Sequence, residues 1–154
     1  MKLKKSPLAP EKFPSLPYVK GLKIGTSKSN IRYKNRQDIL TVTFDNLASV
    51  AGVFTLSQIP AAPVNFCKKN LINGYARGLV VNAGIANSFT GKKGINNNRK
   101  IANYFSKLIN ARQKDVFVCS TGVIGEQLPL LKTKRAIKSS YLSKKKNFKN
   151  AAKA

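Results

Sequence analysis

Two segments rich in small residues carry the groups that could stabilise a developing negative charge. The first runs from Asn82 to Gly91 and the second from Ser120 to Gly125. Small residues let backbone N–H groups approach a ligand, and a loop that leads into a helix presents unpaired N–H donors to an anion. In the second segment, Thr121 and Gly122 combine a hydroxyl with an unobstructed backbone amide. This pair could hold the oxygen of an attacked carbonyl as it becomes negative, which predicts an oxyanion hole for acyl transfer.

Other chemistries fit these segments less well. Neither has the GxGxxG or GxxxxGK[ST] spacing of nucleotide-binding loops. The chain has no histidine, which excludes a Ser-His-Asp or Cys-His catalytic centre and a Cys/His zinc site made by this chain alone. Only 5 acidic residues are present and no two are close in sequence, so we predict no metal site. The alternative for both segments is a tight turn in which small residues serve packing alone.

The two cysteines, Cys67 and Cys119, are expected to be structural. They form no CxxC pair and indicate no disulfide framework. Cys119 follows the apolar run Val116–Val118 and has no histidine to activate it, so we expect a buried side chain that packs as a small hydrophobe. Cys67 is expected on a helix face directed toward the core.

The elements that must position these segments follow from hydrophobic periodicity. Residues 39–44 alternate apolar side chains with threonine, the period of two of a strand, and 21–27 is a plausible partner strand. Ser49–Thr55 is expected to form a third strand. Pro60–Val64 is expected to open a short helix, because proline suits a first helical turn.

The second half of the chain reads as strand, loop, helix, twice over. The short apolar runs Leu79–Val81 and Val116–Cys119 predict strands, and each leads through one small-residue segment into a helix. The residues expected to be buried on these helices are Ile95, Ile101, Ala102, Phe105, Leu108 and Ile109 on the first, and Leu131, Ile137 and Tyr141 on the second. We therefore predict an α/β fold with a mixed sheet and helices packed on it. Ligands of such sheets bind beyond the carboxyl ends of strands, where both segments are expected to lie.

Residues 1–18 are expected to form an extended arm broken by prolines, and 19–154 a single α/β domain. The arm lacks the apolar stretch of a signal peptide and no run is long enough to span a bilayer, so the expected compartment is the cytoplasm, with no membrane partner. The net charge is +24. Lysines spread along the whole chain favour a solvated surface, and nucleic-acid binding through phosphate neutralisation is kept as an alternative function.

Several segments, in the order in which they occur, resemble the N-terminal part of the ornithine acetyltransferase family, also called glutamate N-acetyltransferases. The sequences STGVIGEQLP and NAGIANSFTG are specific when they occur together in this order. The likeness spans the chain from Ser6 to about Ala154. The segments that carry it are Ser6–Pro10, Ser49–Thr55, Pro60–Val64, Leu79–Gly91 and Val116–Pro129.

The resemblance implies an enzyme of arginine biosynthesis whose precursor cleaves itself before a threonine. That threonine becomes the N-terminal nucleophile of a β chain, takes an acetyl group from N-acetylornithine and passes it to glutamate. The family fold is an αββα-type sandwich of the self-processing acyltransferase and aminopeptidase kind, and the implied assembly is α2β2. Thr121 and Gly122 match the family's oxyanion-hole positions. No cofactor is implied, although bifunctional members also accept acetyl-CoA as a donor.

Two departures from the family pattern shape the expected activity. Ile85 stands where the family usually has asparagine. The family's MTTD segment and the lysine-glycine stretch before the cleavage threonine would follow Ala154. We therefore expect an incomplete α chain, either a truncated product or a fragment, that supplies the oxyanion hole but not the nucleophile and is inactive alone. An inactive remnant is a further alternative. An incomplete sandwich should also leave apolar sheet surface exposed, which predicts self-association or marginal stability.

Overall fold

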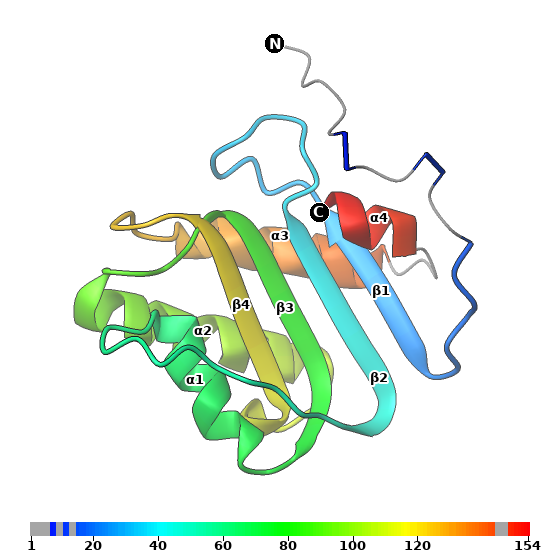
Figure 1. Cartoon of the computed structure of the whole chain (residues 1–154), viewed down its shortest axis with the longest axis horizontal. Coiled ribbons are helices and arrows are strands. Elements are labelled where there is room, and N and C mark those ends of the chain that lie inside the picture. Colours follow the sequence, from blue (N-terminus) through cyan, green and yellow to red (C-terminus); the bar gives the residue numbers. More distant parts are fainter. Residues whose placement is uncertain (1–6, 9–10, 13–14, 144–147) are drawn as a thin grey trace.

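The described residues of the computed structural model form one mixed sheet with helices on one face and beside both edge strands (Figure 1). The structure describes residues 7–8, 11–12, 15–143 and 148–154, so much of the expected arm lies outside the described residues. The strands lie in the order β1-β2-β3-β4. Their bounds are Leu22–Ser27 for β1, Ile39–Ser49 for β2, Tyr75–Ile85 for β3 and Val116–Val123 for β4. This mixed sheet confirms the predicted α/β class.

The first three strands pair antiparallel, and the last two pair parallel. The connection from β1 to β2 is closed by Asp38, whose carboxylate accepts hydrogen bonds from the backbone N–H and the hydroxyl of Ser29 at 2.5 and 2.6 Å. The parallel pair requires a crossover, which the helix between β3 and β4 supplies. As a result, the carboxyl ends of β3 and β4 lie at the same edge of the sheet.

Three of the predicted strand boundaries are wrong. Only Ser49 of the expected strand Ser49–Thr55 lies in a strand, because β2 continues to that residue and the chain then leaves the sheet. Val53 and Leu56 in the segment that follows are 99% exposed, so this apolar stretch has no strand partner. The other two strands extend past their predicted ends. Asn82–Ile85 belongs to β3 and Ser120–Val123 to β4, so much of each small-residue segment is strand rather than loop.

Helices cover one face of the sheet and the β4 edge. The helices α2 (Gly91–Leu108) and α3 (Leu130–Leu142) pack on the sheet face from which Ile39, Val80 and Val118 project. The helix α1 (Ala62–Leu71), with proline in its first turn as predicted, packs beside β4 and α2. The remaining elements are the 3-10 turn η1 (Gln113–Asp115) and α4 (Phe148–Lys153), which contacts β1.

Five of the nine side chains predicted to be buried on these two helices are buried, Leu108 and Tyr141 are half-buried, and Leu131 and Ile95 are exposed. Phe105 of α2 and Ile137 of α3 are 0% exposed and centre the core. Leu131 is 73% exposed because it lies in the first turn of α3, on the side away from the sheet. The buried side of α3 carries Thr133 and Ala136 instead. Ile95 is also exposed, since it borders a hollow between α1 and α2.

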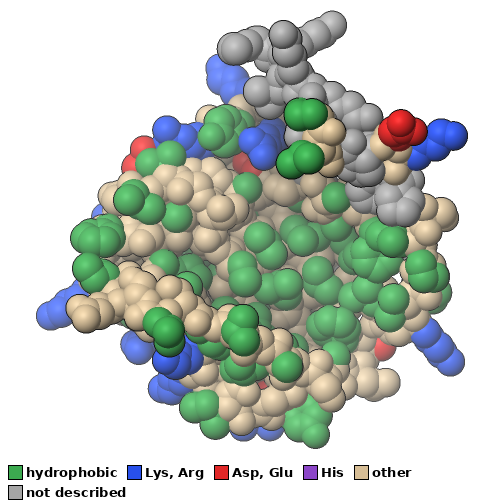
Figure 2. Space-filling model, viewed as in Figure 1, with side chains coloured by type: hydrophobic (Ala, Val, Ile, Leu, Met, Phe, Trp, Pro, Cys, Tyr) green, Lys and Arg blue, Asp and Glu red, His purple; other side chains and the backbone are tan. Residues whose placement is uncertain are grey.

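The second face of the sheet is apolar and largely uncovered over its central strands. The half-buried side chains on this face alternate with the core residues along β2 and β3. Figure 2 views this face and shows hydrophobic side chains across its middle. They include Leu40, Val42, Phe44, Leu79 and Val81. None of the described helices is both long and apolar enough to cross a membrane.

Candidate active site

Thr121 and Gly122 lie side by side near the carboxyl end of β4, where both are exposed. They stand opposite Ala83 and Gly84 of β3 in the parallel register. The position is therefore the open strand end at which ligands of α/β sheets bind, as the sequence predicted. A turn buried away from the surface would have excluded the oxyanion assignment, and the structure has no such burial here.

Gly122 occupies a position that accepts no side chain. Its φ of +130° lies in a region that L residues rarely adopt. A Cβ placed on it would lie 2.2 Å from the carbonyl carbon of Gly84 and 2.4 Å from the oxygen. The two strand ends approach this closely because Gly122 has no side chain, whereas a Cβ on Gly84 would instead lie 3.2 Å from Cβ of Arg32. The backbone of Gly122 is therefore held against β3, and the residue is exposed at the surface.

Hydrogen bonds from buried side chains hold the backbone before this pair. The hydroxyl of Ser120 donates to Oδ1 of Asn82 at 2.6 Å. Asn82 is 1% exposed, and its Nδ2 donates to the carbonyl oxygen of Ile85 at 2.8 Å. The position where the family usually has asparagine is thus a buried isoleucine whose backbone, rather than its side chain, takes part in the network. These contacts fix the two strand ends relative to each other.

The remainder of the first segment forms a tight polar turn into α2. The hydroxyl of Thr90 donates to Oδ1 of Asn87 at 2.8 Å, and Nδ2 of Asn87 donates to the carbonyl oxygen of Gly94 at 3.1 Å. Asn87 itself has a φ of +50°, a left-handed conformation that asparagine tolerates better than most residues. A Cβ on Gly94 would lie 1.8 Å from the hydroxyl oxygen of Thr90, so this glycine is required by packing.

Backbone bonds join the two small-residue segments into one unit. The N–H of Ala86 donates to the carbonyl oxygen of Val123 at 2.9 Å, and the N–H of Gly125 donates to that of Ser88 at 2.8 Å. An ion pair closes the outer side, where Nη1 of Arg32 lies 2.8 Å from Oε1 of Glu126. The hydrogen bond to Glu126 raises the pKa of Arg32. The segments that the sequence singled out separately are therefore parts of a single site.

Comparison with known proteins identifies the family. The ArgJ family model matches residues 23–154. The chain belongs to the ArgJ family. It is 50% identical over 127 residues to the arginine biosynthesis bifunctional protein ArgJ of Rhizobium meliloti, covering 82% of this chain and 31% of that protein. The Bartonella henselae ArgJ is 41% identical over 155 residues, covering 100% of this chain and 38% of the relative. The chain thus spans about a third of the length of these relatives.

Two solved structures share the fold of this ArgJ-family chain. The crystal structure of ArgJ from Bacillus halodurans superposes with a TM-score of 0.74 at 30% identity, covering 77% of this chain and 62% of that one. The ornithine acetyltransferase of Mycobacterium tuberculosis, solved in complex with ornithine, gives a TM-score of 0.79 at 27% identity. That match covers 88% of this chain and 73% of the other. The recognised family resemblance is therefore confirmed.

The cysteines of this ArgJ-family chain differ from expectation in one respect. Cys67 is buried on α1, as predicted, and its thiol donates to the carbonyl oxygen of Val118 at 3.2 Å. Cys119 is exposed rather than buried, because its side chain projects onto the uncovered sheet face. The interaction with the Cys67 thiol lowers the pKa of Cys119 to about 7, and the same interaction raises the pKa of Cys67. Both thiols border an apolar hollow of about 260 Å³.

Sequence reasoning did not find the residues that brace this site. The Ser120–Asn82 bond and the Gly122–Gly84 contact depend on the parallel register of β3 and β4, which no local pattern encodes. The glycine at each strand end was the only local signal. Across the part of the chain that the structure describes, no three His, Cys, Asp or Glu side chains gather where they could hold one metal ion.

Proposed function

We propose that this chain supplies the oxyanion hole of a glutamate N-acetyltransferase of arginine biosynthesis. The observation that carries the proposal is the placement of Thr121 and Gly122, adjacent and exposed at a strand end where Gly122 accepts no side chain. In this role the Thr121 hydroxyl and the Gly122 N–H donate hydrogen bonds to the carbonyl oxygen of the acetyl group as it gains negative charge. Membership of the ArgJ family supports the assignment.

The donors act by being in place before the reaction. The strand register, the Ser120–Asn82 bond and the close approach to Gly84 restrict the backbone that carries them. Fixed donors need no reorganisation as charge develops, and removing one typically lowers the rate by about 10²- to 10³-fold. Two such donors would therefore provide a substantial part of the rate enhancement.

The nucleophile in this proposal is the N-terminal threonine of a β chain, with its own α-amino group as general base. It takes the acetyl group from N-acetylornithine and passes it to glutamate, within an α2β2 assembly in the cytoplasm. The bifunctional name of the relatives is consistent with acetyl-CoA as a second donor, and ornithine is bound in the Mycobacterium tuberculosis structure. The β chain would add the second sheet of an αββα sandwich, which suits the apolar face over β2 and β3.

Reconstitution tests the proposal. This chain is mixed or co-expressed with the remainder of the Rhizobium meliloti relative, and acetyl transfer from N-acetylornithine to glutamate is measured. We expect no transfer by this chain alone, none by the remainder alone, and transfer by the two together. If the two parts form a stable complex but transfer no acetyl group, the inactive-remnant alternative is supported. Transfer by this chain alone would contradict the assignment of the nucleophile to a β chain.

A further inference from the structure

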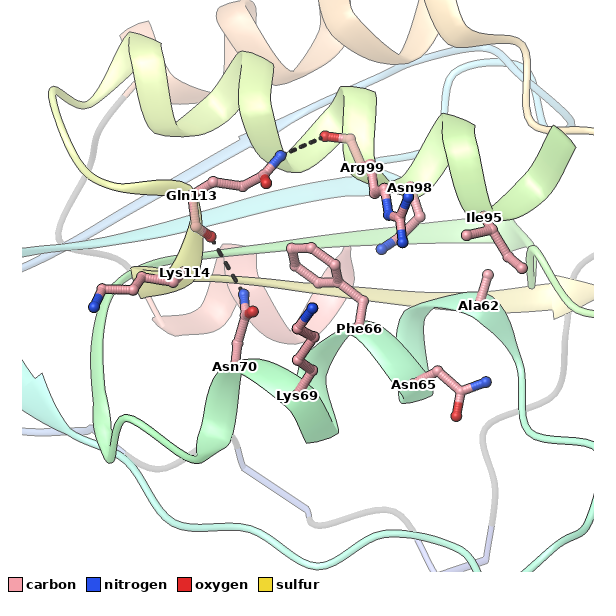
Figure 3. Close-up of a pocket in the computed structure, with 10 residues that line it drawn as sticks. All are labelled: Ala62, Asn65, Phe66, Lys69, Asn70, Ile95, Asn98, Arg99, Gln113 and Lys114. Carbon is pink, nitrogen blue, oxygen red and sulfur yellow. Dashed lines mark hydrogen bonds between the residues drawn. The ribbon is translucent and has the colours of Figure 1, made fainter. Parts of the chain in front are cut away.

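A hollow of about 650 Å³ lies between α1 and α2, beside η1. This volume is in the range of small-molecule sites. Figure 3 shows Phe66 and Lys69 of α1 directed toward α2, from which Asn98 and Arg99 reach toward them. None of its lining residues belongs to the segments 82–91 and 120–125. The residues that line it are Ala62, Asn65, Phe66, Lys69, Asn70, Ile95, Asn98, Arg99, Gln113 and Lys114.

Asn98 brings an unpaired amide to this hollow. Its side chain is 1% exposed, and neither Nδ2 nor Oδ1 has a hydrogen-bond partner among the described residues. The neighbouring Asn70 differs, since its Nδ2 donates to the carbonyl oxygens of Val116 at 2.8 Å and Gln113 at 3.3 Å. A buried polar group without a partner costs about 1–3 kcal/mol, and folded proteins contain few of them. Asn98 therefore brings an unpaired amide nitrogen and an unpaired amide oxygen to the wall of the hollow.

The charge around this amide is positive and uncompensated. Lys69, Arg99 and Lys114 line the hollow, and none of the described carboxylates does. The ion pairs found among residues 15–143 join other cations to Asp45, Asp115 and Glu126. The Lys69 ammonium and the Arg99 guanidinium are directed toward the same space, whereas Lys114 points away from it (Figure 3). The hollow is thus suited to an anion.

We propose that this hollow binds a phosphate group that retains one O–H. Its charged oxygens would accept hydrogen bonds from Lys69, from Arg99 and from Nδ2 of Asn98, and its O–H would donate to Oδ1 of Asn98. The guanidinium fork matches the spacing of two phosphate oxygens. Sulfate has the same tetrahedral shape and the charge of HPO₄²⁻, but it has no O–H near neutral pH, so it satisfies the cations and leaves Oδ1 unpaired. The group could come from inorganic phosphate or from a small ester whose organic part lies against Phe66.

The test is calorimetric titration of the 154-residue chain with inorganic phosphate, phenyl phosphate and sulfate at one ionic strength. The pH is set to about 6, where the second ionisation of a phosphate ester lies and part of the ester keeps its O–H. We expect phosphate to bind about tenfold more tightly than sulfate, since a hydrogen bond to a charged group is at stake. Tighter binding of phenyl phosphate would identify an ester as the source, and equal binding would identify free phosphate.

Variants distinguish specific binding of phosphate in this hollow from non-specific attraction of an anion to a chain with many lysines and arginines. Arg99→Gln should weaken phosphate binding about tenfold. Arg135→Gln, which removes the same charge from an exposed position on α3, should leave it unchanged. Asn98→Leu should abolish the preference for phosphate over sulfate. In the absence of phosphate, the melting temperature of this variant should be no lower than that of the unaltered chain, because the substitution removes an unpaired buried amide. Equal binding of sulfate, or equal losses in Arg99→Gln and Arg135→Gln, would overturn the proposal.

Discussion

Substitution of Gly122 by alanine should destabilise the chain by an amount that follows from the site geometry. The new Cβ would lie 2.2 Å from the carbonyl carbon of Gly84, at a φ of +130°. Backbone strain of this kind contributes about 1–3 kcal/mol, and forced repacking adds about 1–3 kcal/mol. The sum of about 2–6 kcal/mol is a large share of a total stability of about 5–15 kcal/mol. At a typical urea m-value of about 2 kcal/mol/M, the unfolding midpoint should fall by about 1–3 M.

The matched control is Gly52→Ala, measured by circular dichroism in the same urea titration. A Cβ on Gly52 meets no atom within 4 Å, and Gly52 is not among the positive-φ glycines. This variant should be unchanged or stabilised by about 0.4–1 kcal/mol, through the lower entropy of its unfolded chain. Equal midpoints for Gly122→Ala and Gly52→Ala would refute the close contact between the ends of β3 and β4, and with it the rigid placement of the site.

Three further predictions concern the surface. Because the pKa of Cys119 is lowered to about 7, the rate of its reaction with iodoacetamide should reach half of its maximum near that pH and increase above it, as more thiolate forms. Cys67→Ala should move the midpoint of this pH profile upward. An unmoved midpoint would contradict the contact between the two thiols. The uncovered apolar face should drive self-association, which Val81→Lys at its centre should reduce in sedimentation experiments, whereas unchanged sedimentation would count against this face. With a net charge of +24, the chain should bind duplex DNA only weakly, without sequence preference and less as salt increases. Tight, sequence-selective binding at physiological salt would instead favour the nucleic-acid alternative.

Local sequence patterns were sufficient to predict the helices, because the buried face of a helix follows from the spacing of its own apolar residues. The helix stripe ending in Phe105 and Ile109 is fixed by periodicity along a single helix, so it could be read without knowing its partners. The helix opened by Pro63 was predictable for the same reason. The crossover between β3 and β4 then placed both small-residue segments at one edge of the sheet. The position of Thr121 and Gly122 at a strand end was within reach of sequence reasoning.

Features that depend on contacts with residues distant in the sequence could not be predicted from local patterns. Val53 has the composition of a strand residue, but a strand also requires a neighbour with free backbone groups, and the sequence does not say whether one is present. Cys119 follows three buried apolar residues, yet it projects onto the face that the described residues leave open. The Asn82–Ser120 bond spans 38 residues and arises from strand register alone.

The central claim is that Thr121 and Gly122 stabilise the oxyanion, and the rate of acetyl-enzyme formation tests it most directly. Single-turnover acylation by N-acetylornithine should be followed in the reconstituted enzyme carrying Thr121→Ala or Thr121→Ser. Loss of the hydroxyl should slow acylation by about 10²- to 10³-fold with the fold unchanged, whereas serine, which keeps the hydroxyl, should retain most of the rate. Acylation by Thr121→Ala at the unaltered rate would contradict the account.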